Sequence, residues 1–531
     1  MNSLHTRNVS IVLIIILLII PTFYMSSVSS EYILKTSNTI LFVGGSGLGN
    51  YTKIQEAIDN SSERDIIFVY NGTYHENLII QKSVDIIGED KNNTVINGLT
   101  SGDTIRIDAN NVNLSGFTVK TNDPHGNGLI FLGENNTVSN SIFIGSNDIS
   151  VQCHWDNNTL INNYFHAVVI IGSDNNKIIG NDFFYRGIYV ESSSHNNTIL
   201  NNTINGKPLI FLEKESNKVI SSAGQVVLLD CANITITDLS IFDISAGVQL
   251  LNSTYCTVTD SSFVNCSFGV ILDKNSKYNH ISDNTYDYCL CGAYICLSSN
   301  NIIYNNKIGN SRYFYDPSVY STAICLYRSD NNTFYDNTVF NTTGYGCFLT
   351  QSYNNHFYHN SFLNNTKNAH DDGRNHWNSS FREGNYWDDY TGLDNNSDGR
   401  GDTPYNISGG DNKDYYPMMG YDNVLPFIKI IKPDCSFYFM NHKLGVLSLN
   451  MPFVIGKLTI EVNAFDNESG IKRVEFYIDD ELKYSDNVKP YTYDWIRDKK
   501  ISFKHRHSIK VVAYDRYNNS KDDSIDVIRF L

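Results

Sequence analysis

Oxygen-bearing side chains recur at alternate positions of one glycine-containing segment near residue 400. A hard cation such as Ca²⁺ needs convergent oxygen ligands, and Gly399 at the sixth position allows the sharp turn that brings them together. The twelfth position is Tyr405, where an EF-hand would place Glu, so the segment is not a true EF-hand. A turn rich in Asx and Gly that needs no metal is the alternative. The predicted calcium ligands are Asp394, Asn396, Asp398, Arg400 through its backbone carbonyl, and Asp402.

A second group of reactive side chains precedes this segment and combines carboxylates, imidazoles and a cation. General acid–base chemistry requires such titratable groups within reach of one substrate. The group contains His370, Asp371, Asp372, Arg374 and His376. A catalytic site formed by the first four is one interpretation. A structural role in the end of the fold is the other.

Copper would require a pattern of soft or imidazole ligands that recurs in the sequence. Most histidines are scattered, without a His-x-His repeat or a methionine ladder. A lone histidine at a turn is more often a polar residue exposed to solvent than a metal ligand. Cys289 and Cys291 are spaced to face the same side of a strand, but no Met or His partner recurs with them. The sequence therefore does not favour copper. The scattered histidines are His154, His166, His195, His280, His356 and His359.

The elements that position these groups are built on a repeat. The phrase Asn-Asn-x-Ile-x-x-Asn recurs between residues 92 and 360, at intervals of about 18 to 23 residues, with one longer interval that carries an insertion near residues 312–320. Self-similarity with this period is typical of a solenoid. Clear copies begin at Asn135, Asn157, Asn175 and Asn196.

The apolar runs inside each repeat are short, rich in Ile, Val, Phe and Tyr, and separated by Asn, Gly, Ser and Asp. This pattern predicts strands and tight turns, and no repeat contains a ten-residue amphipathic helix. Asparagine suits the corners because it tolerates left-handed backbone angles. Amides stacked on successive coils can also bond into ladders. The predicted fold is a parallel β-helix.

The N-terminus predicts export. His5 and Arg7 precede an uninterrupted apolar run over residues 9–20, and Ser27, Val28 and Ser29 supply small residues at cleavage spacing. These features are typical of a secretory signal peptide. An uncleaved anchor over residues 9–28 is the alternative. We expect a secreted or cell-surface protein.

Charge and cysteines add two constraints. The formal charge of −16 and the absence of a basic stripe argue against nucleic-acid binding. Nine of the ten cysteines fall within the repeats, and Cys266 and Cys289 are one coil apart. They form either a disulfide between adjacent coils or part of a ladder of buried thiols.

Roughly twenty Asn-x-Ser/Thr matches, many at coil corners, make N-glycosylation a further expectation.

Residues 51–58, with Ile54, Ala57 and Ile58 on one face, predict a short helix that covers the open end of the first coil. The run that follows, "DIIFVYNGTYHENLIIQKSVDIIGEDKNNTVING", resembles the opening of pectin-lyase-like right-handed β-helix proteins. In particular it is similar to the NosD-like family, the "periplasmic copper-binding" β-helix proteins common among archaeal surface proteins.

The far end of the repeats strengthens the resemblance. The pattern N-A-x-D-x-G-x-N-x-W, then G-N-Y-W-x-D-Y, G-D-T-P-Y and Y-P-M, closes NosD-like β-helices, and residues 368–418 match it nearly throughout. The resemblance covers about residues 40–419. It implies a right-handed parallel β-helix and assigns Asp371 to the closing coil. Its implication for activity is weaker, since the family includes a copper-enzyme accessory factor and many surface proteins without assigned chemistry.

Right-handed β-helices also include lyases, hydrolases and esterases that act on acidic polysaccharides. Their motifs are missing here: the chain has only the pair Asp371-Asp372 and a lone His125-Gly126 where a hydrolase would have clustered aspartates and Gly-His-Gly. The sequence therefore argues against a standard enzyme of this fold. A polysaccharide lyase or hydrolase with an atypical site is the first alternative function, and a copper-delivery factor is the second.

Beyond residue 421 the Asn-Asn phrase stops and strands at sandwich spacing are predicted over residues 458–465, 474–478, 491–495 and 508–513. The sequence from Phe465 to Trp495 and from His507 to Asn519 resembles bacterial-type immunoglobulin-like domains, with Asp479 and Asp480 at the turn of a hairpin. Such domains space or anchor a partner domain.

The predicted fold class is therefore all-β: a right-handed parallel β-helix solenoid followed by an immunoglobulin-like β-sandwich. The predicted function is a non-catalytic protein that binds extracellular polysaccharide or neighbouring surface proteins, with Ca²⁺ as the one expected cofactor. Membrane contact is expected only through the N-terminal segment if it is uncleaved. The predicted divisions are residues 1–29 (signal peptide or anchor), 40–90 (cap and first coils), 91–367 (repeats), 368–420 (closing segment with the calcium loop) and 425–531 (Ig-like domain).

Overall fold

The computed structural model describes residues 38–311, 321–396, 398–420, 425–446, 451–466, 470–496, 505–515 and 519–530, with backbone only at 146–150 and 167. The predicted signal peptide and the insertion at residues 312–320 lie outside these residues. Within them, no helix combines the length and apolarity that crossing a membrane requires.

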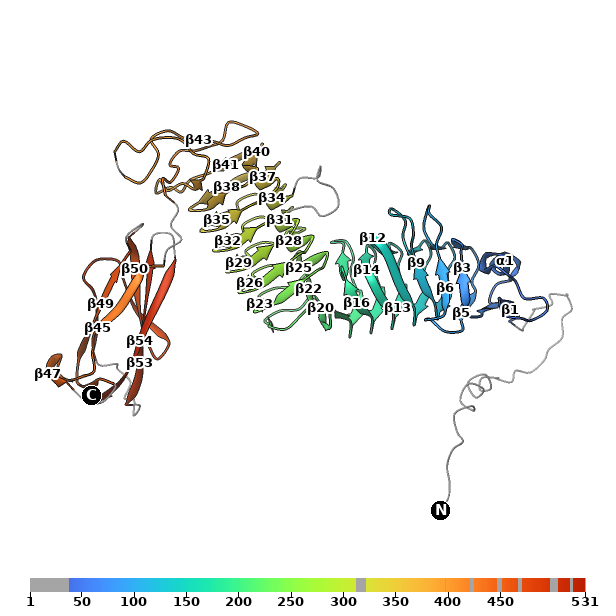
Figure 1. The fold of residues 1–531 in the computed structure, drawn as a ribbon, viewed down its shortest axis with the longest axis horizontal. Helices are drawn as coiled ribbons and strands as arrows, with labels where there is room; N and C mark the ends of the chain where they lie inside the picture. The colour runs from blue at the N-terminus through green and yellow to red at the C-terminus, as the bar shows by residue number, and fades with distance from the viewer. Residues whose placement is uncertain are drawn as a thin grey trace, which may run out of the picture. The chain divides into compact units, whose positions relative to one another are not determined.

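Short parallel strands stacked coil upon coil run from β1 at residue 40 to β42 at residue 387, and the register pairs each strand with its equivalent one coil later (Figure 1). One sheet of the N-terminal coils contains β1 (Ile40–Val43), β2 (Ile66–Val69), β5 (Asp85–Gly88), β8 (Asn113–Ser115), β11 (Thr137–Ser139), β13 (Thr159–Ile161), β15 (Lys177–Ile179) and β18 (Thr198–Leu200).

A second sheet extends through all the coils. It contains β3 (Gly72–Tyr74), β4 (Leu78–Ile80), β6 (Thr94–Asn97), β7 (Ile105–Ile107), β9 (Thr118–Lys120), β10 (Leu129–Phe131), β12 (Ile142–Cys153), β14 (Tyr164–Ile171), β16 (Asp182–Tyr185), β17 (Ile188–Val190), β19 (Thr203–Ile204), β20 (Lys207–Glu213), β22 (Gln225–Leu229), β25 (Ala246–Leu251), β28 (Phe268–Asp273), β31 (Cys291–Cys296), β34 (Thr322–Tyr327), β37 (Tyr345–Thr350) and β40 (Lys367–Asp371).

The C-terminal coils have two further sheets. The first is formed by β21 (Val219–Ile220), β23 (Thr235–Thr237), β26 (Thr257–Thr259), β29 (His280–Ser282), β32 (Ile302–Tyr304), β35 (Thr333–Tyr335), β38 (Tyr353–Tyr358) and β41 (Arg374–His376). The second is formed by β24 (Ser240–Phe242), β27 (Ser262–Val264), β30 (Thr285–Asp287), β33 (Lys307–Gly309), β36 (Thr338–Phe340), β39 (Ser361–Leu363) and β42 (Tyr386–Trp387).

The predicted helix is confirmed as α1 (Ile54–Asn60), which buries Ile54, Ala57 and Ile58 against the first coil. Glu76 holds its N-terminus: the two carboxylate oxygens accept hydrogen bonds from the backbone N–H groups of Ile54 at 2.8 Å and Gln55 at 3.0 Å. A helix end leaves such N–H groups unpaired, so this carboxylate replaces a conventional N-cap.

Each Asn-Asn phrase supplies two structural roles. The first asparagine occupies an exposed corner in the left-handed region, with φ of 58° at Asn135 and 62° at Asn157. The second is buried, and its Oδ1 accepts the backbone N–H of the equivalent residue on the preceding coil. Asn136 donates to Asn158 Oδ1 at 2.9 Å in this way. The predicted left-handed corners and amide ladder are both confirmed.

In the C-terminal coils three such ladders run side by side through the core. A buried N–H without a partner is costly, so each ladder fixes the register of its coils. The first passes through Asn279, Asn301, Asn332, Asn355 and Asn375, the second through Asn284, Asn306, Asn337, Asn360 and Asn385, and the third through Ser253, Ser276, Ser298, Ser329 and Ser352.

The coil pattern is interrupted once, where β19 turns back onto β20 as an antiparallel hairpin. Two buried glutamines then serve the backbone of β17. Gln225 Oε1 accepts the N–H of Ile188 at 3.0 Å and its Nε2 donates to the same residue's carbonyl at 2.6 Å. Gln249 does the same for Val190. These amides therefore replace the strand that β17 would otherwise need as a neighbour.

All ten cysteines are free thiols, and most are buried. Cys266 and Cys289 contact each other across adjacent coils, and this contact together with burial raises the pKa of Cys266. Burial alone raises the pKa of Cys153 to about 12. In the structure these side chains act as small core residues.

After the coils, β43 (Tyr405–Asn406) and β44 (Lys413–Asp414) form a small hairpin. The C-terminal domain is an antiparallel sandwich, as predicted, and the turn residues Asp479 and Asp480 have φ of 51° and 64°. One sheet contains β45 (Phe427–Lys432), β49 (Leu458–Phe465) and β52 (Tyr491–Trp495). The other contains β46 (Ser436–Phe439), β47 (His442–Val446), β48 (Phe453–Ile455), β50 (Ile471–Ile478), β51 (Glu481–Asp486), β53 (Arg506–Asp515) and β54 (Ser520–Phe530).

Candidate functional site

The structure separates the two carboxylates of the predicted acid–base group. Asp371 is fully buried, and its carboxylate accepts hydrogen bonds from Gly373 N at 2.9 Å, Asn375 Nδ2 at 2.7 Å and Trp377 Nε1 at 2.9 Å. Burial raises its pKa, and the three donors oppose that shift. Asp372 instead lies on the surface, where it accepts bonds from Thr350 and from the backbone of Gln351.

The remaining members of this group face different neighbours. His370 stacks on Phe348 with ring centroids 4.7 Å apart, while His376 stacks on His356 at 4.6 Å. Arg374 is exposed. Because Asp371 points into the core, the arrangement offers a substrate one surface carboxylate and one cation, not a pair of carboxylates across a bond.

A second buried carboxylate occupies the equivalent place in the other ladder. Asp414 accepts hydrogen bonds from Asn385 N at 2.7 Å, Trp387 Nε1 at 2.9 Å and Tyr416 N at 3.0 Å. Burial raises its pKa to about 6, against the opposing effect of these donors. Sequence reasoning did not single out Asp414. The sequence did contain a signal. In the first Asn-x-Trp unit, Asp371 stands four residues before Asn375, but the second unit, at residues 385–387, has no Asp at that position and so needs an acceptor from elsewhere.

The predicted calcium loop is exposed and organised by its own backbone. Asp394 accepts the N–H groups of Asp398 at 3.1 Å and Gly399 at 2.8 Å, and Gly399 has a φ of +82°. Asp402 accepts both nitrogens of Asn395. A carboxylate oxygen accepts more than one bond, so these contacts leave capacity for a hard cation. Carboxylate, amide and carbonyl oxygens are the donor types that Ca²⁺ takes, although the carboxylates of this loop do not gather into a metal-holding group within the residues that the structure describes.

Copper fits less well. In the described parts of the chain, no three His, Cys, Asp or Glu side chains gather in a way that could hold a metal ion. The histidine pair closest to such a site is His356 and His376, whose rings stack face on at 4.6 Å with 19° between their planes. Two imidazoles without a third ligand fall short of the ligand sets of protein copper sites.

The sheet from β23 to β41 carries outward columns that the sequence analysis did not identify. The register aligns Tyr304, Tyr335 and Tyr358, one on each of three successive coils. We call these three residues the Tyr column. The same column continues through residues that also carry a hydroxyl group, in the order Thr237, Thr259 and Ser282.

Beside the Tyr column lies a turn column in the left-handed region. It consists of Asp238, Asp260, Asp283, Asn305, Asp336 and His359. His359 Nδ1 lies 3.5 Å from Asp336 Oδ1 and its Nε2 lies 3.4 Å from Glu383 Oε2. Once the coils are aligned, Tyr304, Tyr335 and Tyr358 and their turn-column neighbours are the third and fourth residues after the buried Asn of each coil. The outward direction of these side chains required the register.

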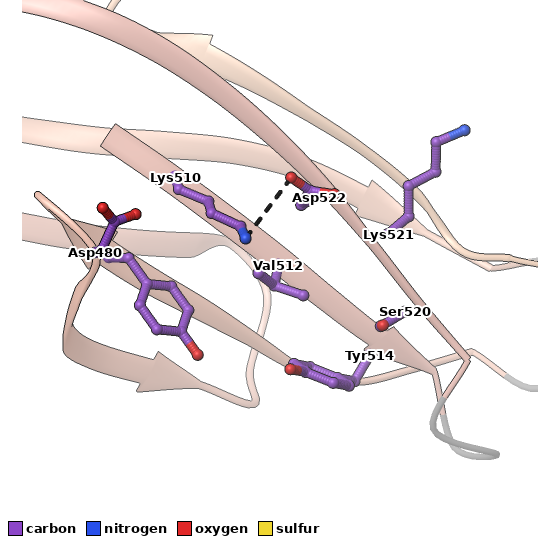
Figure 2. Close-up of a pocket in the computed structure, with 8 residues that line it drawn as sticks. Asp480, Lys510, Val512, Tyr514, Ser520, Lys521 and Asp522 are labelled. Atoms are coloured by element: carbon purple, nitrogen blue, oxygen red, sulfur yellow. Dashed lines mark ion pairs between the residues drawn. The ribbon is translucent and has the colours of Figure 1, made fainter. Parts of the chain in front are cut away.

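The Ig-like domain has a shallow polar hollow on the sheet of β50, β53 and β54. Figure 2 shows Lys510, Val512 and Tyr514 side by side along one strand, with an ion pair from Lys510 to Asp522 at 4.0 Å. The Arg473 guanidinium lies 3.7 Å from the centre of the Tyr514 ring. Two carboxylates, Asp480 and Asp522, line the hollow, and Asp522 is the one paired with Lys510.

Comparisons with known proteins identify both parts of the chain. Residues 209–392 match the family described as "Periplasmic copper-binding protein (NosD)", and residues 453–511 match "Bacterial Ig domain". No curated protein sequence gives a significant match.

Solved structures that resemble the chain do so at low overall similarity. They include pectin methylesterase PemA from Erwinia chrysanthemi, with 11% identity over 66% of this chain and 94% of that one at a TM-score of 0.22. The A-module of the Azotobacter vinelandii mannuronan C-5 epimerase AlgE6 has 12% identity over 62% and 92%, at 0.25. The fibronectin(III)-like modules of Clostridium thermocellum CbhA have 27% identity over 20% and 47%, at 0.15, so the match spans less than half of that protein. By the family models, residues 209–392 are similar to the NosD family and residues 453–511 to bacterial Ig domains.

Proposed function

We propose that this chain is an exported, non-catalytic β-helix protein whose coils bind an extracellular polysaccharide. The observation that carries the proposal is the repetition of one side-chain type at one position of successive coils, as in the Tyr column and the turn column beside it. A repeating surface contacts a repeating polymer several times at fixed spacing, and the contacts reinforce one another.

Two features support binding over catalysis. Asp371 is directed into the core and satisfied there, so the predicted acid–base group lacks its second surface carboxylate. The charge of −16 is distributed without a basic stripe. Export is supported by the apolar N-terminal run and by the family descriptions, and the Ig domain then serves as a spacer or anchor.

Incubation of the purified full chain with a panel of neutral and acidic polysaccharides tests the proposal. We expect retention of the protein on at least one polymer, with no release of reducing ends and no rise in ultraviolet absorbance from unsaturated uronates. Product formation would overturn the non-catalytic proposal. In that case the variants Asp372→Asn and Arg374→Ala test whether these two exposed residues of the predicted acid–base group carry out the reaction.

We also propose that the loop at residues 394–402 binds Ca²⁺ as a structural ion. A cation that binds only the folded state raises its stability in proportion to its concentration over the dissociation constant. We expect added Ca²⁺ to raise the melting temperature and a chelator to lower it. Asp398→Asn should remove this response, whereas Asp411→Asn, an exposed aspartate in the same closing segment, should keep it. A melting curve that neither addition moves would contradict the proposal.

A further inference from the structure

The Tyr column has an unusual arrangement for aromatic side chains on a surface. Neighbouring rings lie face to face: the centroids of Tyr304 and Tyr335 are 5.0 Å apart with 5° between planes, and those of Tyr335 and Tyr358 are 5.4 Å apart with 4°. Both faces of Tyr335 are therefore covered by other rings. A sugar cannot stack on these faces, as it would on an open aromatic platform.

What the column does present is its ring edges and hydroxyl groups. None of the three phenol oxygens hydrogen-bonds to another residue in the parts of the chain that the structure describes. Burial and the neighbouring phenols raise the pKa of Tyr335 to about 12, and burial also raises the pKa of Tyr358. The phenols of Tyr335 and Tyr358 are therefore protonated at neutral pH, and a phenol hydroxyl can both donate and accept a hydrogen bond.

The charge beside the column restricts what can lie on it. Asp283 and Asp336 flank it from the turn column, and Glu383 lies at its C-terminal end. His359 is the one basic group among the turn-column residues, and it is placed between two carboxylates. A polymer with a carboxylate on each unit would meet like charges along this track, so electrostatics disfavours it.

We propose that the Tyr column is a binding track for an uncharged polysaccharide whose chain lies along the coil axis, with successive sugar hydroxyls bonded to the hydroxyls of Tyr304, Tyr335 and Tyr358. The inference rests on the proposed function and names its face and its ligand class. Adjacent coils are about 4.8 Å apart, close to the length of one pyranose unit in an extended chain. Each coil therefore meets an equivalent group of the polymer.

The test is a variant of the full chain that loses only three oxygen atoms, Tyr304→Phe with Tyr335→Phe and Tyr358→Phe. The rings remain stacked, so the fold is retained. The matched control is Tyr255→Phe with Tyr278→Phe, another stacked pair, at 5.1 Å, on an exposed corner outside the column. The probes are hydroxyethylcellulose, chitosan and polygalacturonate, followed by affinity electrophoresis at low and moderate salt.

We expect the parent and the control to be retarded by hydroxyethylcellulose and the triple variant to bind it at least tenfold more weakly, since each lost hydrogen bond is worth about 0.5–1.5 kcal/mol. Equal retardation of the triple variant would overturn the track and leave polysaccharide binding intact. Preference for polygalacturonate, or salt-sensitive preference for chitosan, would also overturn it, because charge would then select the ligand. Failure of the parent to bind any of the wider panel would instead overturn the proposed function.

Discussion

Replacing Asn332 with leucine is expected to lower the free energy of unfolding of the β-helix by about 3–5 kcal/mol. Asn332 lies in the middle of its ladder, where Oδ1 accepts both the backbone N–H and the Nδ2–H of Asn301, and Nδ2 donates to the carbonyl of Ser298. All three bonds are buried. Leucine fills much of the same volume but leaves the backbone N–H of Asn301 and the carbonyl of Ser298 without these partners, and each costs about 1–3 kcal/mol. Asn301 Nδ2 keeps its hydrogen bonds to the carbonyls of Ser276 and Ser299.

The matched control is Asn331→Gly, at the exposed corner one residue earlier. Its φ of 57° suits glycine, so we expect a change below about 1 kcal/mol. Urea unfolding followed by circular dichroism measures both variants. Solenoids can unfold in parts, so a transition that splits in the Asn332 variant would also show that the ladder couples its coils. A stability equal to that of the parent would show that the ladder contributes nothing net.

The repeat was readable from the sequence because its two signals are local. Asparagine at a corner needs only its own backbone angle, and the buried asparagine follows it directly, so a single phrase reveals both. The helix α1 and the strands of the Ig-like domain were also predictable, since hydrophobic periodicity determines each of them. β49 and β52 have the predicted bounds.

Long-range partners were not readable. Glu76 reaches the start of α1 from 22 residues away, and Gln225 pairs with a residue 37 positions earlier. Neither has a local signature, because a buried polar side chain is defined by the group it satisfies. The Tyr column depends on register in the same way: its members are obvious only when the coils are aligned.

The two candidate sites also differ in how far their geometry could be predicted from local sequence. The calcium loop is a local turn, and its side-chain bonds to its own backbone follow from its sequence. The acid–base group looked like one site because its members are adjacent in sequence. The structure sends Asp371 inward to Trp377 and leaves Asp372 outside. Adjacent residues with opposite environments do not make one site.

The closing motif of the NosD resemblance has a physical explanation in these contacts. Two Asn-x-Trp units each end an amide ladder and continue a stack of core aromatic rings, with Trp377 on Phe357 at 4.4 Å and Trp387 on Phe362 at 4.5 Å. Each unit then needs an acceptor for its indole and amide donors, because no further coil supplies one. Asp371 and Asp414 are those acceptors. The motif thus terminates a repeating core without leaving buried donors unpaired.

Replacing Asp414 with alanine should therefore destabilise the closing segment by about 4 kcal/mol or more, since Asn385 and Trp387 would lose a buried acceptor. Asp411→Ala, an exposed neighbour, is the control and should change the stability little. Urea unfolding followed by tryptophan fluorescence measures the effect, because Trp377 and Trp387 are buried at this end. Unfolding midpoints that agree for the two variants would contradict the assigned role.

The destabilisation caused by Asp414→Ala should depend on pH, and the pKa of Asp414 determines the direction of that dependence. The folded-state pKa of Asp414 is about 6, above the value of about 3.9 expected for an unfolded chain. The folded state then binds a proton more tightly, so the stability from this group is fully present below about pH 4 and is lost as the pH rises through 6. Asp414→Ala removes the titration, so the gap in unfolding free energy between parent and variant should narrow from pH 4 to pH 7. A gap that widens over this range would mean that the hydrogen-bond donors around Asp414 outweigh burial and hold the carboxylate ionised.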